Sequence, residues 1–255
     1  MKILLTNDDG IMSEGLRTLA KNISNLGDVI VVAPNSEKSA IGHAITINNP
    51  LKIRRIHLDC NEKEAYAIEG TPVDCVKFGV NVILNNTKPD ILISGINNGI
   101  NLGTDVIYSG TVSAAIEGTI LGIKSIALSA GNSNDSGLEA AAKFAAHMSS
   151  ILHQKEMPYG TLLNVNVPAL PENKIKGIKV ANLGVKKYAD KYIKRKDPRG
   201  NDYYWLSGDI LEEDDCVNCD IRAFKEGYIT ITPLHYDLTR YDMIQEIEKW
   251  NFTFS

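Results

Sequence analysis

The sequence lacks the features that mark membrane, secreted and nucleic-acid-binding proteins. Among its 255 residues no apolar run approaches the ~18–20 residues that a transmembrane helix needs. Asp8 and Asp9 interrupt the N-terminal apolar run before a signal-type segment could form. The chain has 27 basic and 31 acidic residues, a net charge of −4, whereas a dedicated DNA or RNA binder usually carries a strong basic excess. We therefore expect a cytoplasmic protein with no membrane and no nucleic-acid polymer as partner.

Cysteines and several catalytic motifs are also scarce or missing. Of the four cysteines, only Cys216 and Cys219 form a C-x-x-C pair, which is half of a zinc site. We expect all four to be reduced thiols, because cytosolic disulfides are rare. The sequence contains no G-x-x-x-x-G-K-[ST], G-x-G-x-x-G, G-x-S-x-G or H-E-x-x-H. P-loop hydrolases, dehydrogenases of the usual dinucleotide-binding pattern, serine hydrolases and zincins each lose their main sequence support.

The first 170 residues alternate between strand-like and helix-like patterns. Short apolar runs typical of buried strands occupy residues 3–5, 29–33, 91–93, 126–128 and 162–167. Helical patterns lie between them, at residues 16–23, from Thr71, from Ser109 and over 138–153. Strands separated by helices of this length form βαβ units with right-handed crossovers. The pattern predicts an α/β fold with a mostly parallel sheet flanked by helices.

The pattern changes near residue 170, where Pro168 and Pro171 interrupt the chain. Residues 180–185, 203–206 and 228–232 are typical of antiparallel strands, and residues 239–250 of a final helix. The basic, tyrosine-bearing segment Lys186–Arg199 could form an extended hairpin arm. Because no clean linker separates the two parts, we expect a single domain over residues 1–255. Its core would span about 1–170 and its extension about 171–255.

Four polar clusters are placed where an open α/β sheet binds ligands, beyond the carboxyl ends of strands. They are Asn7–Gly10, Pro34–His43, Ser94–Gly103 and Tyr108–Thr111. Neighbouring residues of an extended strand point to opposite faces, so Asp8 and Asp9 converge only if the chain turns there, which Gly10 permits. A solvated turn is the alternative, but two unpaired charges after a central strand would be costly.

The donor atoms of these clusters favour one kind of chemistry. Carboxylate, amide and hydroxyl oxygens are hard ligands that suit magnesium, manganese or calcium. The helix start at Ser109–Thr111 offers free N–H groups and a positive dipole end to an anion, although ordinary N-capping is the alternative. A hard cation facing a helix N-terminus is what a phosphate ester requires.

Motifs in a fixed order extend along nearly the whole chain. They are Lys2–Gly10, Ala33–Pro34 with Ser39 and Gly42–His43, Gly70–Pro72 with Asp74–Cys75, Ser94–Gly103, Asp105–Val112 with Ala114–Ala115 and Glu117–Gly118, and Thr232–Leu234 with Asp237–Thr239. This pattern resembles the SurE (survival protein E) family, with Ala40 and Thr104 as departures from it. The resemblance implies a metal-dependent 5′/3′-nucleotidase that releases orthophosphate from nucleoside monophosphates, and in some members also acts on short polyphosphate.

The resemblance also implies a site and an assembly. It implies a Rossmann-like core with a β-hairpin extension, and a homodimer or homotetramer formed by exchange of C-terminal arms, here Lys186–Arg199 and the tail after about Leu234. It implies one divalent metal ion per subunit, Mg²⁺ or Mn²⁺ in solution and Ca²⁺ as an occupant in crystals. The implied metal ligands are Asp8, Asp9, Ser39 and Asn97, of which Asp8, Asp9 and Asn97 are the catalytic candidates. The implied substrate-binding residues are Ser109, Gly110, Thr111, Asn101 and His43.

The mechanism that we expect is direct hydrolysis, with Asp8 as the preferred acceptor of the proton of water. A covalent aspartyl-phosphate at Asp8 is the alternative route. A non-catalytic nucleotide or metal sensor would use the same pocket. Adjacent carboxylates argue against a pure anion receptor, for which arginine serves better. An oxidoreductase is a further alternative, but the sequence lacks the dinucleotide-binding fingerprint that would support it.

Overall fold

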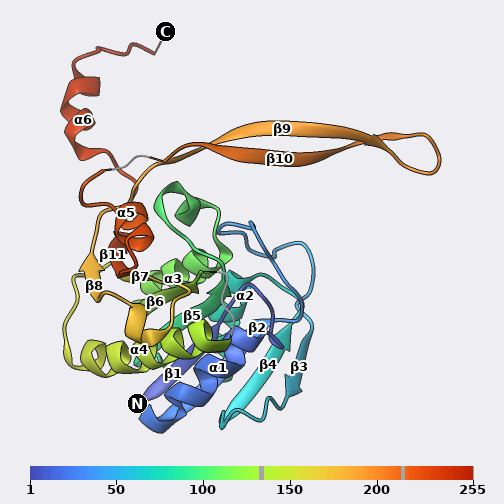
Figure 1. Cartoon of the computed structure of the whole chain (residues 1–255), viewed down its shortest axis with the longest axis vertical. Helices are drawn as coiled ribbons and strands as arrows, with labels where there is room; N and C mark the ends of the chain where they lie inside the picture. Colours follow the sequence, from blue (N-terminus) through green and yellow to red (C-terminus); the bar gives the residue numbers. More distant parts are fainter. Residues whose placement is uncertain (132–134, 214–215, 255) are drawn as a thin grey trace.

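A mostly parallel sheet runs through the core of the molecule, with helices on both faces (Figure 1). The computed structural model describes residues 1–131, 135–213 and 216–254. Helices α1 (Glu14–Ile23) and α4 (Asp135–Gln154) pack together on one face of the sheet, and helices α2 (Pro72–Phe78) and α3 (Gly110–Ile120) pack together on the other. The predicted α/β fold with a mostly parallel sheet is confirmed.

The strands of the described residues form one large sheet and one separate hairpin. Their bounds are β1 (Lys2–Thr6), β2 (Asp28–Pro34), β3 (Ile53–Ile56), β4 (Glu64–Ile68), β5 (Ile91–Asn98), β6 (Lys124–Ala130), β7 (Thr161–Val167), β8 (Ile178–Val180), β9 (Lys186–Lys196), β10 (Asp202–Glu213) and β11 (Ile229–His235). In the described part of the chain, the large sheet has the order β3-β4-β2-β1-β5-β6-β7-β11-β8. Its β3–β4 and β7–β11 pairs are antiparallel, and its remaining pairs are parallel.

Helices connect most of these strands. Their bounds are α1 (Glu14–Ile23), α2 (Pro72–Phe78), α3 (Gly110–Ile120), α4 (Asp135–Gln154), α5 (Asp220–Lys225) and α6 (Tyr241–Glu248), with short turns η1 (Ser24–Leu26), η2 (Gly79–Ile83), η3 (Gly103–Ile107) and η4 (Glu172–Lys174). Among the described residues, none of the helices combines the length and the apolar character that crossing a bilayer would require.

Strand β1 is buried on both faces, which explains its short unbroken apolar run. Ile3 and Leu5 pack in the core beneath α1 and α4, whereas Leu4 packs in the core beneath α2 and α3. The chain leaves β1 for β2 on one side and later returns to β5 on the other. The carboxyl ends of β1 and β5 therefore form the switch point of the sheet, where open α/β folds bind their ligands.

The starts of two helices follow the expected capping chemistry. Thr71 caps α2, and a capping box with Asp74 satisfies the backbone N–H groups of both residues. Ser109 caps α3, with its Oγ accepting a hydrogen bond from the Val112 N–H at 3.1 Å. These caps fix α3 so that its N-terminus opens at the switch point.

The predicted antiparallel strand over residues 180–185 is wrong. Strand β8 ends at Val180 and runs parallel to β11. Beyond it, the Asn182 N–H donates to the Asn218 carbonyl and the Gly184 N–H donates to the Asp220 carboxylate, at 2.9 and 2.8 Å. The backbone of Asn182 and Gly184 therefore bonds to residues around the start of α5, whereas the Ala181 N–H still donates to the Ile231 carbonyl of β11, at 3.0 Å.

Strands β3 and β4 were not predicted, since they lack a continuous apolar run. Strand β3 is an edge strand whose centre is Arg54 and Arg55. The final helix forms as expected but is shorter than predicted: α6 covers Tyr241–Glu248, whereas the prediction was 239–250.

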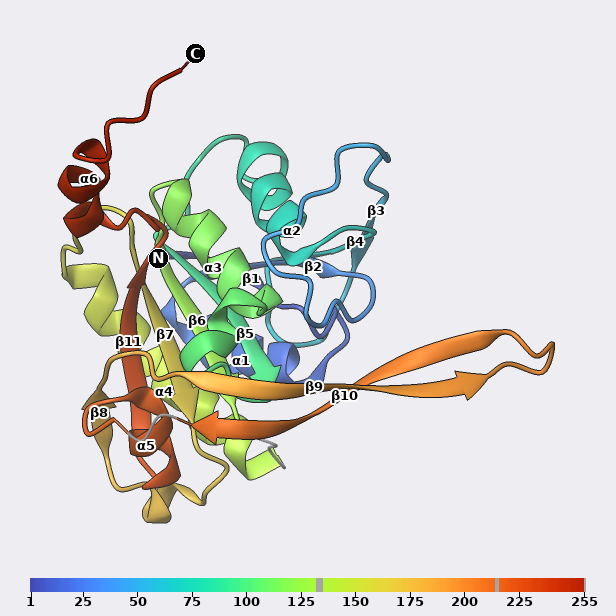
Figure 2. The ribbon, with the colours of Figure 1, turned by 90° about the horizontal axis from the view of Figure 1, so that it is seen from above.

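The predicted hairpin arm is confirmed and is longer than expected. Strands β9 and β10 pair only with each other in the described residues, and they project well beyond the core (Figure 2). Arg199 lies in the turn between them. The root of the hairpin lies beside the core, close to η3.

Asp74 ties the loop after β2 to helix α2. Its carboxylate accepts hydrogen bonds from the Thr46 N–H and hydroxyl, at 3.0 and 2.6 Å, and from the Thr71 N–H at 2.9 Å. Burial alone would raise the pKa of Asp74, but hydrogen bonds from Thr46 and Thr71 hold it below its ordinary value. The ionised form therefore stabilises the fold.

We expect Asp74→Asn to lower the free energy of unfolding at pH 7 by about 1–3 kcal/mol, because buried donors lose a charged acceptor. A carboxyl group with a lowered pKa stabilises the fold above its unfolded pKa, about 3.9, and loses that contribution as pH falls through the folded value. The difference from wild type should shrink at about pH 3. Urea denaturation at both pH values measures this difference in the free energy of unfolding. Glu69→Gln, at an exposed position, is the control. A loss independent of pH would contradict the role of the charge.

Candidate active site

A cavity of about 680 Å³ lies at the switch point of the sheet. Its lining residues come from all four polar clusters of the sequence, from η3 and from the hairpin. They are Asp8, Asp9, Glu37, Ser39, Ala40, Asn97, Asn98, Ile100, Asn101, Asp105, Tyr108, Ser109, Tyr188, Asp190, Leu206 and Gly208. Of the residues proposed for the site, the cavity brings together Asp8, Asp9, Ser39, Asn97, Asn101 and Ser109.

Asp8 is held against the N-terminus of α3. The Thr111 N–H donates to Asp8 Oδ2 at 3.0 Å, and the Thr111 hydroxyl donates to Asp8 Oδ1. A Cβ atom added to Gly110 would lie 2.9 Å from both the Cβ and Oδ2 of Asp8, so the helix must begin with glycine at this contact. Thr111 therefore supports Asp8 from behind, and the absence of a side chain at Gly110 leaves room for the carboxylate.

The turn that brings both carboxylates to the cavity is built by Asn7. Its side-chain nitrogen donates to the Gly10 carbonyl at 3.0 Å and to Ser13 Oγ at 2.7 Å, and its oxygen accepts from the Gly10 N–H at 3.2 Å. Gly10 has a φ of +98°, a conformation that favours glycine. Asn7 is thus a positioning residue for Asp8 and Asp9 that sequence reasoning missed, although it stands in the same cluster.

The loop after β2 brings a third carboxylate to the cavity. The Lys38 N–H donates to the Asp8 carbonyl at 2.7 Å and joins this loop to the first. Within the loop, the Ser39 hydroxyl donates to Glu37 Oε1. Glu37 lines the cavity beside Asp8 and Asp9 and was also missed, because one acid in a polar loop carries no distinctive signal.

The cavity concentrates negative charge. Burial raises the pKa of Asp8 despite its hydrogen bonds from Thr111, and Glu37 raises it further. Burial also raises the pKa of Asp9 to about 6, where a hydrogen bond from the Asn98 N–H lowers it and the charges of Asp8 and Glu37 raise it. Among the described lining residues there is no lysine or arginine to balance these carboxylates.

The donor set of this cavity fits a hard divalent cation. Asp8 and Asp9 offer carboxylate oxygens and Ser39 offers a hydroxyl oxygen, which are ligands of magnesium and manganese. In the described residues, at this cavity or away from it, no group of three or more His, Cys, Asp or Glu side chains is placed to hold a metal. The cavity itself relies on two adjacent carboxylates together with hydroxyl and amide oxygens.

Asn97 is aimed by an irregularity in β5. The pairing register with β6 shifts between Ser94 and Asn97, as in a β-bulge. A Cβ atom on Gly95 would lie 2.2 Å from the Leu128 carbonyl oxygen, so only glycine fits there. The side-chain nitrogen of Asn97 donates to the Gly99 carbonyl at 2.9 Å. The amide oxygen is therefore the atom that Asn97 can offer to a cation.

Asn101 rests on a layer of buried polar side chains. Its N–H donates to Asn166 Oδ1 at 2.8 Å, and its side-chain nitrogen donates to Ser129 Oγ at 2.8 Å. Its carbonyl oxygen accepts hydrogen bonds from the side-chain nitrogens of Asn164 and Asn166, at 2.8 and 3.1 Å. Two asparagines within the otherwise apolar run of β7 were the available sequence signal for this support.

His43 lies apart from the lining residues. Its Nε2 is 3.0 Å from Glu117 Oε2, and the Lys77 ammonium is 2.9 Å from Glu117 Oε1. These contacts join the loop after β2 to helices α2 and α3. In this structure His43 has a bridging position between elements, and its contact with substrate stays a prediction.

The comparisons with known proteins agree on one family. A family model described as "Survival protein SurE" matches residues 3–190. A protein named 5'-nucleotidase SurE from Alkaliphilus metalliredigens (strain QYMF) is 47% identical over 98% of this chain and 99% of its own length. Another of the same name, from Thermoanaerobacter sp. (strain X514), is 48% identical over 98% of each chain. The crystal structure of the SurE protein from Aquifex aeolicus aligns with a TM-score of 0.84, at 42% identity over 98% of this chain and 99% of that one.

Thr111→Val tests the support of Asp8 directly, because it removes the hydroxyl donor and keeps the shape of the side chain and the backbone N–H. Hydrogen bonding by the Thr111 hydroxyl lowers the pKa of Asp8. We therefore expect Thr111→Val to raise that pKa further, as measured by NMR titration of the carboxyl carbons in metal-free protein. Thr111→Ser keeps the donor and serves as control. An unchanged pKa in the valine variant would contradict the contact.

Proposed function

The chain belongs to the SurE family, and from this we propose that it is a divalent-metal-dependent phosphatase that hydrolyses nucleoside 5′- and 3′-monophosphates to nucleoside and orthophosphate. Curated relatives over nearly the full chain carry the name 5'-nucleotidase SurE. The observation that carries the proposal is the pair of adjacent, partly or fully buried carboxylates, Asp8 and Asp9, at the N-terminus of α3 without a basic residue in the described lining.

We assign the metal to Asp8, Asp9, Ser39 and Asn97. Asp8 is prepared for this role, because Thr111 fixes both of its oxygens and stabilises its charged form. A bound divalent ion would offset the charge of the carboxylates and polarise a phosphate oxygen. The expected ions are Mg²⁺ and Mn²⁺, with Ca²⁺ as an occupant in crystals, one per subunit.

We place the phosphate group at the start of α3. Ser109 is the cap of α3 and Gly110 is its first residue, so their N–H groups lie at the helix start, where backbone donors and the helix dipole favour an anion. Thr111 acts from behind, since both of its donors are taken by Asp8. Asn101, which lines the cavity, is a further polar residue that we assign to the phosphate.

Direct attack by water is the mechanism that we propose. Each oxygen of Asp8 already accepts a hydrogen bond, whereas Asp9 accepts one, from the Asn98 N–H at 3.1 Å. Asp9 thus has more free acceptor capacity for a proton from water. We therefore propose it as a second candidate for the proton acceptor, beside Asp8, which the sequence favours. Labelled phosphate trapped on Asp8 would instead support the covalent route.

The charge of the cavity bears on the choice of substrate. The carboxylates of Asp8, Asp9 and Glu37, which no lysine or arginine of the described lining balances, would repel a chain of phosphates more strongly than a single phosphate. We therefore propose nucleoside monophosphates as the main substrates and short polyphosphate as a poorer one.

The expected compartment is the cytoplasm.

A metal-dependence assay tests the reaction. We expect phosphate release from 5′-AMP and 3′-AMP to stop with EDTA and to return with added Mn²⁺ or Mg²⁺. Asp8→Asn and Asp9→Asn should each lower turnover by at least about 10²–10³, because they remove metal ligands as well as charge. Glu14→Gln, an exposed change on α1, is the control.

Two results would contradict this proposal in different ways. Release unaffected by EDTA and by Asp8→Asn would mean that the reaction takes place elsewhere. Nucleotide binding without any release would identify the protein as a sensor.

We also propose that C-terminal arms exchange between subunits in a homodimer or homotetramer. The support is apolar surface on α6 and the tail, where Ile244 is 44% exposed, Trp250 57% and Phe252 76%. Such a surface is costly to leave in water, and a second copy of the chain would cover it.

A double substitution tests this assembly. We expect Ile247→Glu with Trp250→Glu to reduce the mass measured by light scattering towards that of a monomer, because charges would replace apolar contacts. Gln245→Glu, at an exposed position of the same helix, should leave the mass unchanged. A wild-type protein that is itself a monomer would overturn the proposal.

A further inference from the structure

The cavity has an apolar and aromatic part that phosphate chemistry does not use. Besides its carboxylates, it is lined by Ile100, Tyr108, Tyr188 and Leu206. Inorganic phosphate or a single phosphate group is small and fully polar, so it gains nothing from two aromatic rings. These side chains therefore indicate a larger ligand with an apolar or planar group attached to its phosphate.

One face of the hairpin supplies two of these four side chains, Tyr188 and Leu206. Tyr188 and Asp190 are two residues apart on β9, and Gly208 pairs directly with Asp190 across the hairpin. Leu206 is two residues from Gly208 on β10, so all four side-chain positions share one face. Trp205, which pairs with Ile193, lies on the opposite face and is 62% exposed.

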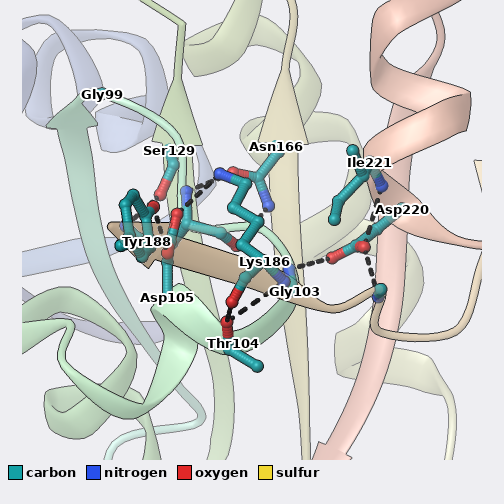
Figure 3. A network of polar contacts seen from close by, with 12 residues as sticks. Gly99, Gly103, Thr104, Asp105, Ser129, Asn166, Lys186, Tyr188, Asp220 and Ile221 are labelled. Atoms are coloured by element: carbon teal, nitrogen blue, oxygen red, sulfur yellow. Dashed lines mark hydrogen bonds and ion pairs between the residues drawn. The ribbon is translucent and has the colours of Figure 1, made fainter. Parts of the chain in front are cut away.

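Tyr188 is held in place at both ends of its side chain. Its backbone is anchored by the hairpin root, and its hydroxyl donates to Asp105 Oδ1 at 2.7 Å. The other oxygen of Asp105 lies 2.6 Å from the Lys186 ammonium, which is almost fully buried (Figure 3). Thr104 joins the same root, since its hydroxyl donates to the Lys186 carbonyl at 2.8 Å. The ring is thus ordered before any ligand binds.

Asp105 also fixes the backbone of the second aromatic residue, Tyr108. The Tyr108 N–H donates to the Asp105 carbonyl at 3.0 Å, at the end of η3. The next residue, Ser109, caps α3 and lies beside the carboxylates. Through this short segment, the ring of Tyr188 and the backbone of Tyr108 are positioned relative to the phosphate end of the cavity.

We propose that Tyr188 is a specificity-determining residue that contacts the nucleoside part of the substrate, with Asp105 and Lys186 as the residues that position it. This inference rests on the proposed phosphatase function and deepens it. A nucleobase is the planar group that an ordered tyrosine ring binds by stacking. Loss of such a stack reduces binding by about 5- to 150-fold. Because the ring is ordered in advance, little of that gain is lost to ordering on binding.

The test compares one substrate with a base and one without, 5′-AMP and ribose 5-phosphate, in the presence of Mg²⁺. We expect Tyr188→Ala to lower kcat/KM for 5′-AMP by about 5- to 150-fold, mainly through KM, and to leave ribose 5-phosphate within about twofold. Tyr188→Phe should keep most of the activity on 5′-AMP, since the ring remains. Trp205→Ala, on the other face of the hairpin, should change neither substrate.

Asp105→Asn tests the positioning role. It should raise KM for 5′-AMP in the same direction as Tyr188→Ala, and should lose this effect when combined with Tyr188→Ala, as coupled residues do. Additive effects of the two changes would remove Asp105 from the proposal.

Other outcomes separate this inference from the function beneath it. Equal losses on both substrates, or no loss on 5′-AMP, would overturn the role of Tyr188. A wild-type protein that hydrolyses neither substrate would contradict the proposed function alone. In that case calorimetry would measure the binding of 5′-AMP and of ribose 5-phosphate to wild type and to Tyr188→Ala. The role of Tyr188 requires that 5′-AMP binds more weakly to the variant than to wild type and that ribose 5-phosphate binds equally to both.

Discussion

The burial of two adjacent carboxylates at the end of a central strand is the constraint on which this molecule is organised. Burial disfavours the ionised form of each, as the raised pKa values of Asp8 and Asp9 indicate. The cost is partly offset by hydrogen bonds from Thr111 and from the Asn98 N–H. Because no basic side chain lines the described part of the cavity, the remaining charge is available for a ligand cation.

This constraint explains several local choices in the sequence. Gly110 leaves room for the Asp8 carboxylate at the helix start, and Gly10 permits the turn that places the two acids side by side. The polar residues Asn164 and Asn166 interrupt the apolar run of β7 because they support the loop of Asn101. Local rules of helix and strand composition are broken where the cavity requires it.

Much of the core could be predicted from sequence, because strands buried on both faces carry a distinctive apolar run. The start of α2 at Thr71 and the cap of α3 at Ser109 could be predicted for a similar reason, since capping depends on neighbouring residues. Strand β3, with Arg54 and Arg55 at its centre, could not, because an edge strand needs no apolar run. The contribution of Tyr188 to the cavity was also beyond reach, since it depends on how a distant hairpin lies against the core.

The loop that carries Asn101 and Asp105 is fastened at two points of different character. At Asn101 it is fixed to the middle of the sheet, and at Asp105 to the root of an arm that extends far beyond the core (Figures 1 and 2). An arm of this length acts as a lever, so a force applied near its tip produces a torque at its root. Because Asp105 joins this root to the lining of the cavity, a displacement of the arm at its root would also displace Tyr188 within the cavity.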